Sequence, residues 1–249
     1  IAALDGVDVT VEPGEVVGLL GTNGAGKSTL INVISGLAPV ASGRVLLDGE
    51  DLLGRLPHER ARLGVSRSFQ QAQLFPSLTV VDNLLVAKHP AMRHGLLEDG
   101  FRLPRARTEE LEARAHVKAV MDVVDLTPFA EARADELSYG TLRLVQLAAM
   151  LAQRPRLLLL DEPAAGLAEA EARALEPLLK KISRTTGVSM VLVEHDVALV
   201  TAVSDRIVGM DSGRVLVSGT PEQVLADPAM IIAYLGLDDA VTAEPEAVR

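Results

Sequence analysis

A nine-residue stretch near the N-terminus constrains the fold of this chain more than any other feature. Glycines in such a stretch permit the positive φ angles that let a backbone wrap around a phosphate, and a helix N-terminus attracts the same anion. An apolar strand is expected at residues 16–20 and a helix at 29–34, on either side of the stretch. This context argues against the alternative, a glycine-rich turn with a surface lysine. The stretch follows the pattern of a glycine, four residues and Gly-Lys-Ser/Thr, and reads Gly21-Thr22-Asn23-Gly24-Ala25-Gly26-Lys27-Ser28-Thr29.

The end of this loop carries the residues with predicted chemical roles. Lys27 would neutralise charge on the β- and γ-phosphates of a nucleotide, and is also a candidate catalytic residue. The hydroxyl of Ser28 would hold Mg²⁺. The whole stretch from Gly21 to Thr29 is therefore predicted to bind a nucleotide.

Composition narrows the class of protein. The chain has 249 residues, of which 48% are hydrophobic and 2% aromatic, so its core must be built from Leu, Val, Ile and Ala. The formal net charge of −10 argues against a general nucleic-acid binder, and no nucleic-acid partner is expected. The sequence contains no cysteine, which rules out disulfides and thiolate chemistry.

Signals for membrane insertion or export are missing from the sequence. No apolar run approaches the roughly 18 residues that span a bilayer. No signal peptide is visible. The sequence begins at Ile1, already close to a strand-like pattern. We therefore expect further residues upstream, in a longer domain or a fusion.

The sequence falls into regions of two kinds, one with strands that alternate with helices and one with helical spacing alone. Residues 1–77 and 155–237 predict a nucleotide-binding core, with a mainly parallel sheet, crossover helices and an N-terminal antiparallel β subdomain. Residues 78–154 carry Ala, Arg, Glu and Leu at helical spacing, which predicts an inserted α-helical subdomain. Residues 238–249 are expected to form a C-terminal tail. The chain is thus predicted to be one α/β domain with a P-loop NTPase core.

The individual elements follow from periodicity and turn residues. Expected strands are residues 1–20 with a turn at 12–15, then 44–49, 156–160, 188–193, 207–210 and 214–218. Expected helices are 57–63, 109–124, 141–152, 168–185 and 221–235, with a loop or broken helix pair at 89–107.

A pair of carboxylates follows an apolar strand in the second half of the chain. Strand ends in an open α/β sheet face the ligand crevice, so Asp161 and Glu162 are expected there. Asp161 could hold Mg²⁺ through its water shell, and Glu162 could polarise the water that attacks a γ-phosphate. Taken alone, the pair fits a solvated strand-to-loop junction at least as well.

Another apolar strand ends in a histidine. His195 follows residues 191–194 and could donate a hydrogen bond to a γ-phosphate, as a catalytic residue. An ordinary surface histidine is the alternative. The other four histidines are interpreted in that ordinary way: His58, His89, His94 and His116.

A second helix start also has the properties of a phosphate site. Ser138 is a good N-cap, and Gly140 keeps the helix entry open. The ordinary interpretation is a plain helix start, whereas the functional one has Ser138, Tyr139 and Gly140 contact nucleotide. Because one chain seldom needs two such termini for one γ-phosphate, a second copy is predicted to supply this one.

Gln70 lies where the predicted core meets the helical block. Its side chain could reach Mg²⁺ or the attacking water, which makes it a candidate metal ligand and catalytic residue. It could also couple the nucleotide to rotation of the helical subdomain. A polar loop residue is the alternative.

Together these motifs resemble the nucleotide-binding domains of ABC transporters. The resemblance covers nearly the whole chain, and the specific feature is the order of five motifs. It implies that ATP and Mg²⁺ bind, that ATP is hydrolysed, and that two copies or paralogues sandwich two ATP molecules head to tail. The motifs in order are the phosphate loop, Gln70, Leu137-Ser138-Tyr139-Gly140, Asp161-Glu162 and His195.

Further segments are similar to the ATPases of branched-chain amino acid importers. Residues 88–107 resemble the insertion that one of the two paralogous ATPases of such importers carries ahead of its signature helix. This implies a peripheral subunit on the cytoplasmic face of the inner or plasma membrane. It would dock on permease subunits, possibly fused to it, and be served indirectly by an external solute-binding protein. The region of Gln70 and the helical subdomain would receive the permease's coupling helices. The similar segments are residues 69–70, 74–80, 83–87, 138–140, 163–167 and 232–236.

The chain departs from the family pattern at three places. Thr141 and Leu142 replace a polar pair, often Gln-Gln, after the signature, and Ala168 replaces an Asp or Asn. The aromatic residue that stacks on adenine would lie before Ile1. A nucleotide-binding subunit with low turnover is therefore one alternative.

Other classes of function also remain open. A non-transport ABC protein of DNA maintenance would carry a long coiled coil, which this chain lacks, and one of translation would carry two cassettes. A P-loop kinase would leave the signature and His195 without a task. The cargo cannot be named from the sequence, because an ATPase subunit does not touch it; branched-chain amino acids, other amino acids, amides and urea all fit.

Overall fold

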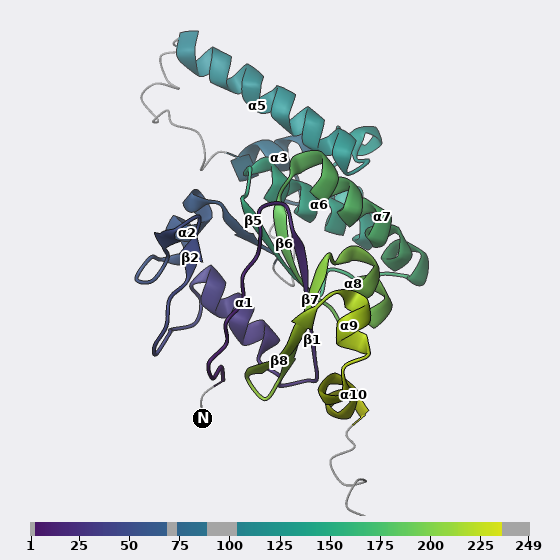
Figure 1. Cartoon of the computed structure of the whole chain (residues 1–249). Helices are drawn as coiled ribbons and strands as arrows, with labels where there is room; N and C mark the ends of the chain where they lie inside the picture. Colours follow the sequence, from purple (N-terminus) through teal and green to yellow (C-terminus); the bar gives the residue numbers. More distant parts are fainter. Residues whose placement is uncertain (1–2, 69–73, 89–103, 236–249) are drawn as a thin grey trace, which may run out of the picture.

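A six-stranded, mostly parallel β-sheet forms the centre of the molecule (Figure 1). The computed structural model describes residues 3–68, 74–88 and 104–235. Strand order is β4-β5-β6-β1-β7-β8, in which β8 alone runs antiparallel to its neighbour. The predicted mainly parallel α/β fold is confirmed. The strands of the sheet are β1 (Val16–Gly21), β4 (Val65–Arg67), β5 (Leu157–Asp161), β6 (Ser189–Val193), β7 (Arg206–Asp211) and β8 (Arg214–Gly219).

Helices cover both faces of this sheet, as parallel strands require. In Figure 1, α1 and α2 lie on one side of the sheet, with α7, α8 and α9 on the other. The helices of these two layers are α1 (Lys27–Ser35) and α2 (Pro57–Leu63), then α7 (Glu169–Thr186), α8 (Val197–Val203), α9 (Pro221–Leu225) and α10 (Pro228–Leu235).

The central strand β1 joins two hydrophobic cores because its side chains alternate between the faces of the sheet. Val16 and Leu20 pack in the core beneath α7 and α8, and Val17 and Leu19 pack in the core beneath α1. At Gly18 a Cβ atom would lie only 2.4 Å from the side chain of Val200, so α8 approaches the strand closely there. All six residues of β1 are buried, which fixes the loop that follows it.

Helices of the middle block pack together at the top of the molecule (Figure 1). The chain leaves the sheet after β4 and returns at β5, and α3 packs against both α5 and α6. The predicted helix at 109–124 is confirmed, although it begins earlier. The block holds α3 (Val80–Lys88), α5 (Pro104–Val123), α6 (Tyr139–Ala152) and the single 3₁₀ turns Thr127–Phe129 and Ala134–Glu136. The expected loop at 89–107 lies largely outside the described residues.

Two predictions about elements were wrong. Residues 3–15, which were expected to be strands, form none, whereas the predicted N-terminal antiparallel part is present as β2 (Leu46–Leu47) paired with β3 (Glu50–Asp51). Side-chain packing of apolar residues such as Val7 and Val9 against the core holds the first segment in place of a ladder. The predicted helix at 221–235 is two helices, because Asp227 accepts hydrogen bonds from the N–H groups of Ala229 and Met230 and begins α10.

Candidate functional site

The ends of four parallel strands bring the predicted site residues to one edge of the sheet. Leu19 of β1 and Asp161 of β5 both pair with Val193, the last residue of β6. Arg67 ends β4 beside Leu159 of β5. Because the carboxyl ends of parallel strands face the ligand crevice, the residues that follow these strands share one side of the molecule.

The loop between β1 and α1 has the backbone geometry of an anion site. Gly24 and Gly26 have φ angles of 87° and 100°, which L-residues rarely adopt. Gly26 is the N-cap of α1 and offers no side-chain cap, so the first N–H groups of the helix are open to a ligand. A Cβ atom at Gly21 would lie 2.2 Å from the carbonyl oxygen of Met210, so only glycine fits there.

Lys27 is the cation of this loop, and it is only 6% exposed. Its Nζ donates hydrogen bonds to the carbonyl oxygens of Gly21 (2.6 Å) and Thr22 (3.0 Å), which places the ammonium across the loop. Burial lowers the pKa of Lys27, and the nearby carboxylates of Glu162 and Asp161 act in the opposite direction. A partly desolvated ammonium gains stabilisation from a phosphate that enters the loop.

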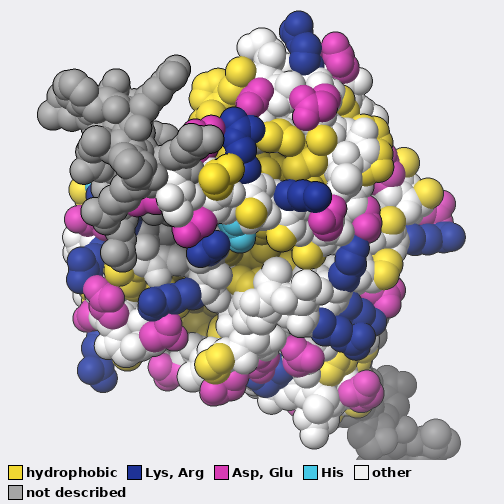
Figure 2. Space-filling model, turned by 90° about the horizontal axis from the view of Figure 1, so that it is seen from above, with side chains coloured by type: hydrophobic (Ala, Val, Ile, Leu, Met, Phe, Trp, Pro, Cys, Tyr) yellow, Lys and Arg dark blue, Asp and Glu magenta, His cyan; other side chains and the backbone are white. Residues whose placement is uncertain are grey.

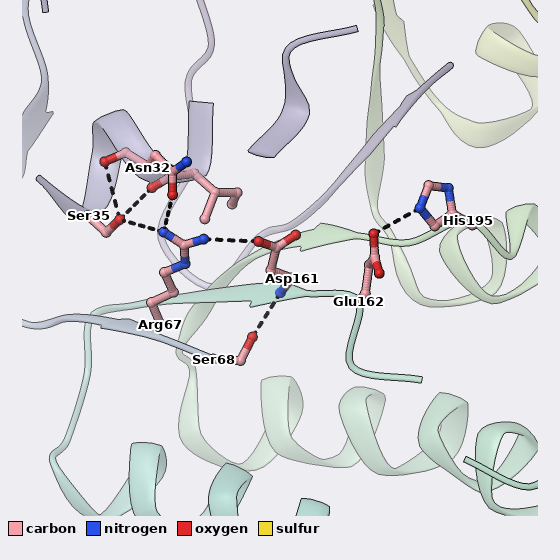
Figure 3. A network of polar contacts seen from close by, with 8 residues as sticks. Asn32, Ser35, Arg67, Ser68, Asp161, Glu162 and His195 are labelled. Carbon is pink, nitrogen blue, oxygen red and sulfur yellow. Dashed lines mark hydrogen bonds and ion pairs between the residues drawn. The ribbon is translucent and has the colours of Figure 1, made fainter. Parts of the chain in front are cut away.

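Asp161 is held by an arginine that sequence analysis did not single out (Figure 3). The guanidinium of Arg67 donates to Asp161 Oδ2 at 3.0 Å, and both side chains are 13% exposed. Arg67 also donates to the side chains of Asn32 and Ser35 on α1. The Ser68 hydroxyl accepts a hydrogen bond from the backbone N–H of Asp161. This network ties the helix after the phosphate loop to the ends of β4 and β5.

Glu162 and His195 form a second pair, on the other side of Asp161 (Figure 3). Glu162 Oε1 lies 2.8 Å from His195 Nε2, and the side chains are 35% and 55% exposed. Glu162 has a φ angle of 51°, a left-handed conformation that is unusual for a residue with a Cβ atom. Such strained backbone is found at functional sites when the surroundings hold it. The pair presents an imidazole and a carboxylate that solvent can still reach.

A buried carboxylate that contacts the backbone beside this pair was missed by the sequence analysis. Glu194 is 5% exposed and accepts hydrogen bonds from the backbone N–H groups of Ala164 and His195. Burial raises its pKa, and these two hydrogen bonds act against that rise. The signal in the sequence was an acidic residue directly after an apolar buried strand.

A cavity of about 500 Å³ joins the phosphate loop to Glu162 and His195. It is lined by the loop from Asn23 to Thr29, by these two side chains, and by Ala3 and Gly213. Ser28 is exposed at its surface. Several of the predicted site residues therefore line one cavity. They are Lys27, Ser28 and Thr29 at the start of α1, and Glu162 and His195 across from them.

The predicted signature residues lie elsewhere. Ser138 caps α6, as predicted, by accepting a hydrogen bond from the N–H of Thr141. The Tyr139 hydroxyl donates to the carbonyl oxygen of Ala165 at 3.3 Å. Gly140 is buried, and a Cβ atom there would lie 2.1 Å from Glu171 Oε1. Residues 138–140 are not among the described residues that line the cavity at the phosphate loop. Gln70 lies outside the described residues.

The oxygen atoms that this site offers suit a Mg²⁺ ion that is held mainly by the phosphates of a bound nucleotide. Among the described residues, no group of three or more His, Asp or Glu side chains is arranged to hold a metal ion by itself. Mg²⁺ prefers oxygen donors, keeps several waters, and is held by one or two carboxylates together with phosphates. The Asp161 carboxylate and the Ser28 hydroxyl fit that requirement.

A groove between the sheet edge and the helical block is a separate feature. It has a volume of about 360 Å³ and lies between Pro57 and Arg67 on one side and Ala87, Gln146 and Met150 on the other. Figure 2 shows the molecule from above, with hydrophobic side chains exposed in the middle of this face among charges of both signs. The described side chains on this face therefore have no uniform basic character that would suit a nucleic-acid backbone.

Comparison with known families decides where the chain belongs. A sequence model of the ABC transporter family matches residues 4–165, which include the phosphate loop, the signature and Glu162. The chain belongs to the ABC transporter family. The predicted family is thus confirmed.

Relatives of this ABC cassette are ATP-binding subunits of amino acid transporters. The high-affinity branched-chain amino acid transport ATP-binding protein BraF of Pseudomonas aeruginosa is 42% identical, covering 95% of this chain and 92% of its own. LivG of Escherichia coli K12, which carries the same description, is 37% identical with the same coverage. The resemblance to this importer branch is confirmed.

Solved structures of ABC cassettes share the fold. The ADP conformation of an ATP-binding cassette of an ABC transporter is 31% identical, with a TM-score of 0.78 over 94% of this chain and 92% of its own. A dimeric post-hydrolysis cassette bound to ADP and Pi is 26% identical, with a TM-score of 0.69 over 88% and 90%. Within the described part of this cassette, no helix is both long and apolar enough to cross a bilayer.

Proposed function

We propose that this cassette is an ATP-hydrolysing subunit of an ABC importer for branched-chain amino acids or related small polar solutes. One observation carries the catalytic part of the proposal: the Glu162–His195 pair lines the same cavity as the phosphate loop. The importer class rests on the similarity to BraF and LivG. The subunit would lie on the cytoplasmic face of the membrane, bound to permease subunits.

The residues that line the cavity, together with Asp161 and Gln70, are proposed to divide the work of hydrolysis among them. The open N–H groups at the start of α1 and the ammonium of Lys27 bind the phosphates. Ser28 and Asp161 would hold Mg²⁺, which supplies positive charge at the phosphate oxygens. Glu162 accepts a proton from the attacking water while the bond from the γ-phosphorus to the bridging oxygen breaks. His195 donates a hydrogen bond to the γ-phosphate, and Gln70 is proposed to contact the metal or water.

The complete site is proposed to need a second cassette. Ser138, Tyr139 and Gly140 are exposed or lie at a helix start, but they do not line the cavity of their own chain among the described residues. A second copy or a paralogue would present these residues to the nucleotide in a head-to-tail dimer. The dimeric relative of known structure supports this arrangement.

The groove beside the helical block is the proposed contact with the permease. It lies between the nucleotide-binding core (1–77 and 155–237) and the proposed signature subdomain (78–154), so its shape depends on how these two parts are oriented. A permease helix seated there would therefore respond to closure of the dimer. An external solute-binding protein would act only through that permease.

A subunit with low turnover is the second candidate. Thr141, one of the departures from the family pattern, places its hydroxyl 3.0 Å from the Ser138 hydroxyl and donates its N–H to the same oxygen. The Ser138 oxygen is thereby engaged within its own helix. Phosphate release by the purified chain, with and without membranes that contain the permease, separates this candidate from an active ATPase.

An inactive variant tests the dimer proposal directly. Glu162→Gln should bind ATP, hydrolyse it only at a low residual rate, and form dimers with saturating ATP and Mg²⁺, alone or with its paralogue. Lys27→Ala is the matched control that should remain monomeric. Light scattering after size-exclusion chromatography measures both. A Glu162→Gln chain that stays monomeric both alone and with its paralogue contradicts the dimer proposal.

The proposed cargo needs a separate test, which is leucine uptake by vesicles reconstituted with the complete transporter.

A further inference from the structure

Glu194 has no task in the chemistry described above, although its position is costly. The side chain is 5% exposed, and a buried carboxylate loses the hydration that it would have in water. It lies directly after the last residue of β6 and directly before His195. A carboxylate retained in such a place needs a specific reason.

The hydrogen bonds of Glu194 reach two different loops. Its Oε1 accepts the N–H of Ala164 at 2.6 Å, and its Oε2 accepts the N–H of His195 at 3.1 Å. Ala164 lies two residues after Glu162, so one carboxylate connects the backbone that carries Glu162 to the backbone that carries His195. The side chains of Glu162 and His195 meet at 2.8 Å.

These contacts close a ring around Glu162. The backbone N–H of Glu162 donates to the carbonyl oxygen of Val193 at 2.8 Å, on the strand that leads to Glu194. Glu162 itself has a φ angle of 51°, which its surroundings must maintain. The hydrogen bond from the Ala164 N–H to Glu194 fixes the backbone two residues after Glu162, on the C-terminal side of this strained residue.

The ring requires two acceptor atoms on one side chain. A carboxylate presents two oxygens, each able to accept, whereas a glutamine presents one oxygen and one NH₂ donor. Hydrogen bonds from N–H groups to a charged acceptor are also shorter and stronger than neutral ones. Glutamine at this position could accept only one of the two hydrogen bonds, and its NH₂ group would repel the other N–H. Alanine would remove both hydrogen bonds.

We propose that Glu194 is a positioning residue for ATP hydrolysis, which clamps the loops of Glu162 and His195 in one fixed relation. The proposal rests on the function proposed above, and it adds a residue that does not touch nucleotide. Its effect is therefore expected on turnover and not on nucleotide binding, because the phosphate loop is held by other contacts.

Turnover and binding are measured separately on the membrane complex that contains the chain. Glu194→Gln should lower kcat about 10-fold, and Glu194→Ala about 100-fold, within the range ascribed to general-base catalysis. The Kd for a fluorescent ATP analogue should stay within about twofold. Glu59→Gln is the matched control, because Glu59 Oε2 accepts the N–H of Leu56 at a helix start away from the site.

A double variant shows whether Glu194 acts through Glu162. Adding Glu194→Gln to a Glu162→Gln chain should change the residual turnover by less than about twofold, because the group being positioned is already gone. Equal losses in both backgrounds would overturn the proposal, and so would a loss explained by weaker nucleotide binding.

Amide hydrogen exchange tests the clamp without reference to activity. The N–H groups of Ala164 and His195 should be protected in the wild-type chain and should exchange at least about tenfold faster in Glu194→Ala. Unchanged exchange at both sites would overturn the clamp even if turnover fell. A wild-type complex with protected amides but no ATP hydrolysis would instead contradict the proposed function and leave the clamp intact.

Discussion

Arg67 and Asp161 form an ion pair of 3.0 Å between the ends of neighbouring strands, with each side chain 13% exposed. The same guanidinium contacts Asn32 and Ser35, so one arginine connects α1, β4 and β5. Asp161 therefore has a structural task in addition to its proposed contact with Mg²⁺.

We predict that Asp161→Asn destabilises the protein even without nucleotide. The substitution leaves the largely buried guanidinium of Arg67 without its counter-charge, which should cost about 1–3 kcal/mol of the free energy of unfolding. Glu162→Gln is the control, because its carboxylate is 35% exposed and faces an imidazole, and should cost under about 1 kcal/mol. Urea unfolding in the presence of EDTA measures both; equal stabilities would show that the Arg67 contact is dispensable.

The two tyrosines of the chain should differ in how much their hydroxyl groups contribute to stability. The Tyr234 hydroxyl accepts a hydrogen bond from the buried Gly21 N–H at 3.2 Å and so ties α10 to the start of the phosphate loop. Tyr234→Phe leaves that N–H without a partner and should cost about 1–2 kcal/mol. Tyr139→Phe should cost under about 0.5 kcal/mol, because water can reach both of its partners, the Arg143 side chain and the Ala165 carbonyl oxygen. Chemical denaturation of the two variants should rank them in this order, and the reverse order would contradict the assignment.

Local sequence signals were sufficient to predict the phosphate loop and the strands around it. The glycines at 24 and 26 do adopt positive φ, and β1, β5 and β6 fall within two residues of their expected bounds. The parallel order followed from strands that alternate with helices. Asp161, Glu162 and His195 could be placed at one edge because parallel strands end on the same side.

Contacts between distant residues could not be predicted in this way. Arg67 and Asp161 are 94 positions apart, and nothing near Arg67 in the sequence indicates its partner. The burial of Glu194 depends on how the loop at Ala164 folds over the end of β6. The apolar pattern before residue 16 was taken for strands, yet these side chains pack on the core without a β-ladder. In each case tertiary packing decides what the local pattern leaves open.

Two glycines should differ sharply in their tolerance of alanine. A Cβ atom at Gly21 meets a backbone oxygen of β7 at 2.2 Å, which cannot move without distorting the sheet. Gly21→Ala should therefore cost about 3 kcal/mol. At Gly140 the Cβ meets the end of the Glu171 side chain, which can swing away at the loss of its hydrogen bond from the Ala168 N–H. Gly140→Ala should cost about 1 kcal/mol. Equal costs in urea unfolding would contradict this account.

The buried carboxylate of Glu194 predicts a specific dependence of stability on pH. Burial raises its pKa above the ordinary value of 4.5, and the neighbouring charge of Glu162 adds to this rise, while the N–H groups of Ala164 and His195 oppose it. Between about pH 4.5 and the folded-state pKa, the folded chain binds more protons than the unfolded chain. The stabilising contribution of Glu194 to the free energy of unfolding is therefore fully present below this pH window and is lost as the pH rises through it.

Glu194→Gln removes this dependence, because glutamine stays neutral. The free energy of unfolding of the wild type relative to Glu194→Gln should fall as the pH rises from 4.5 towards 7. The variant should thus gain relative stability at neutral pH, where we expect it to lose turnover. Urea unfolding of both proteins at pH 4, 5, 6 and 7 measures the difference, in which the other titrating groups cancel. Parallel stability curves would show that Glu194 titrates alike in the folded and unfolded chains.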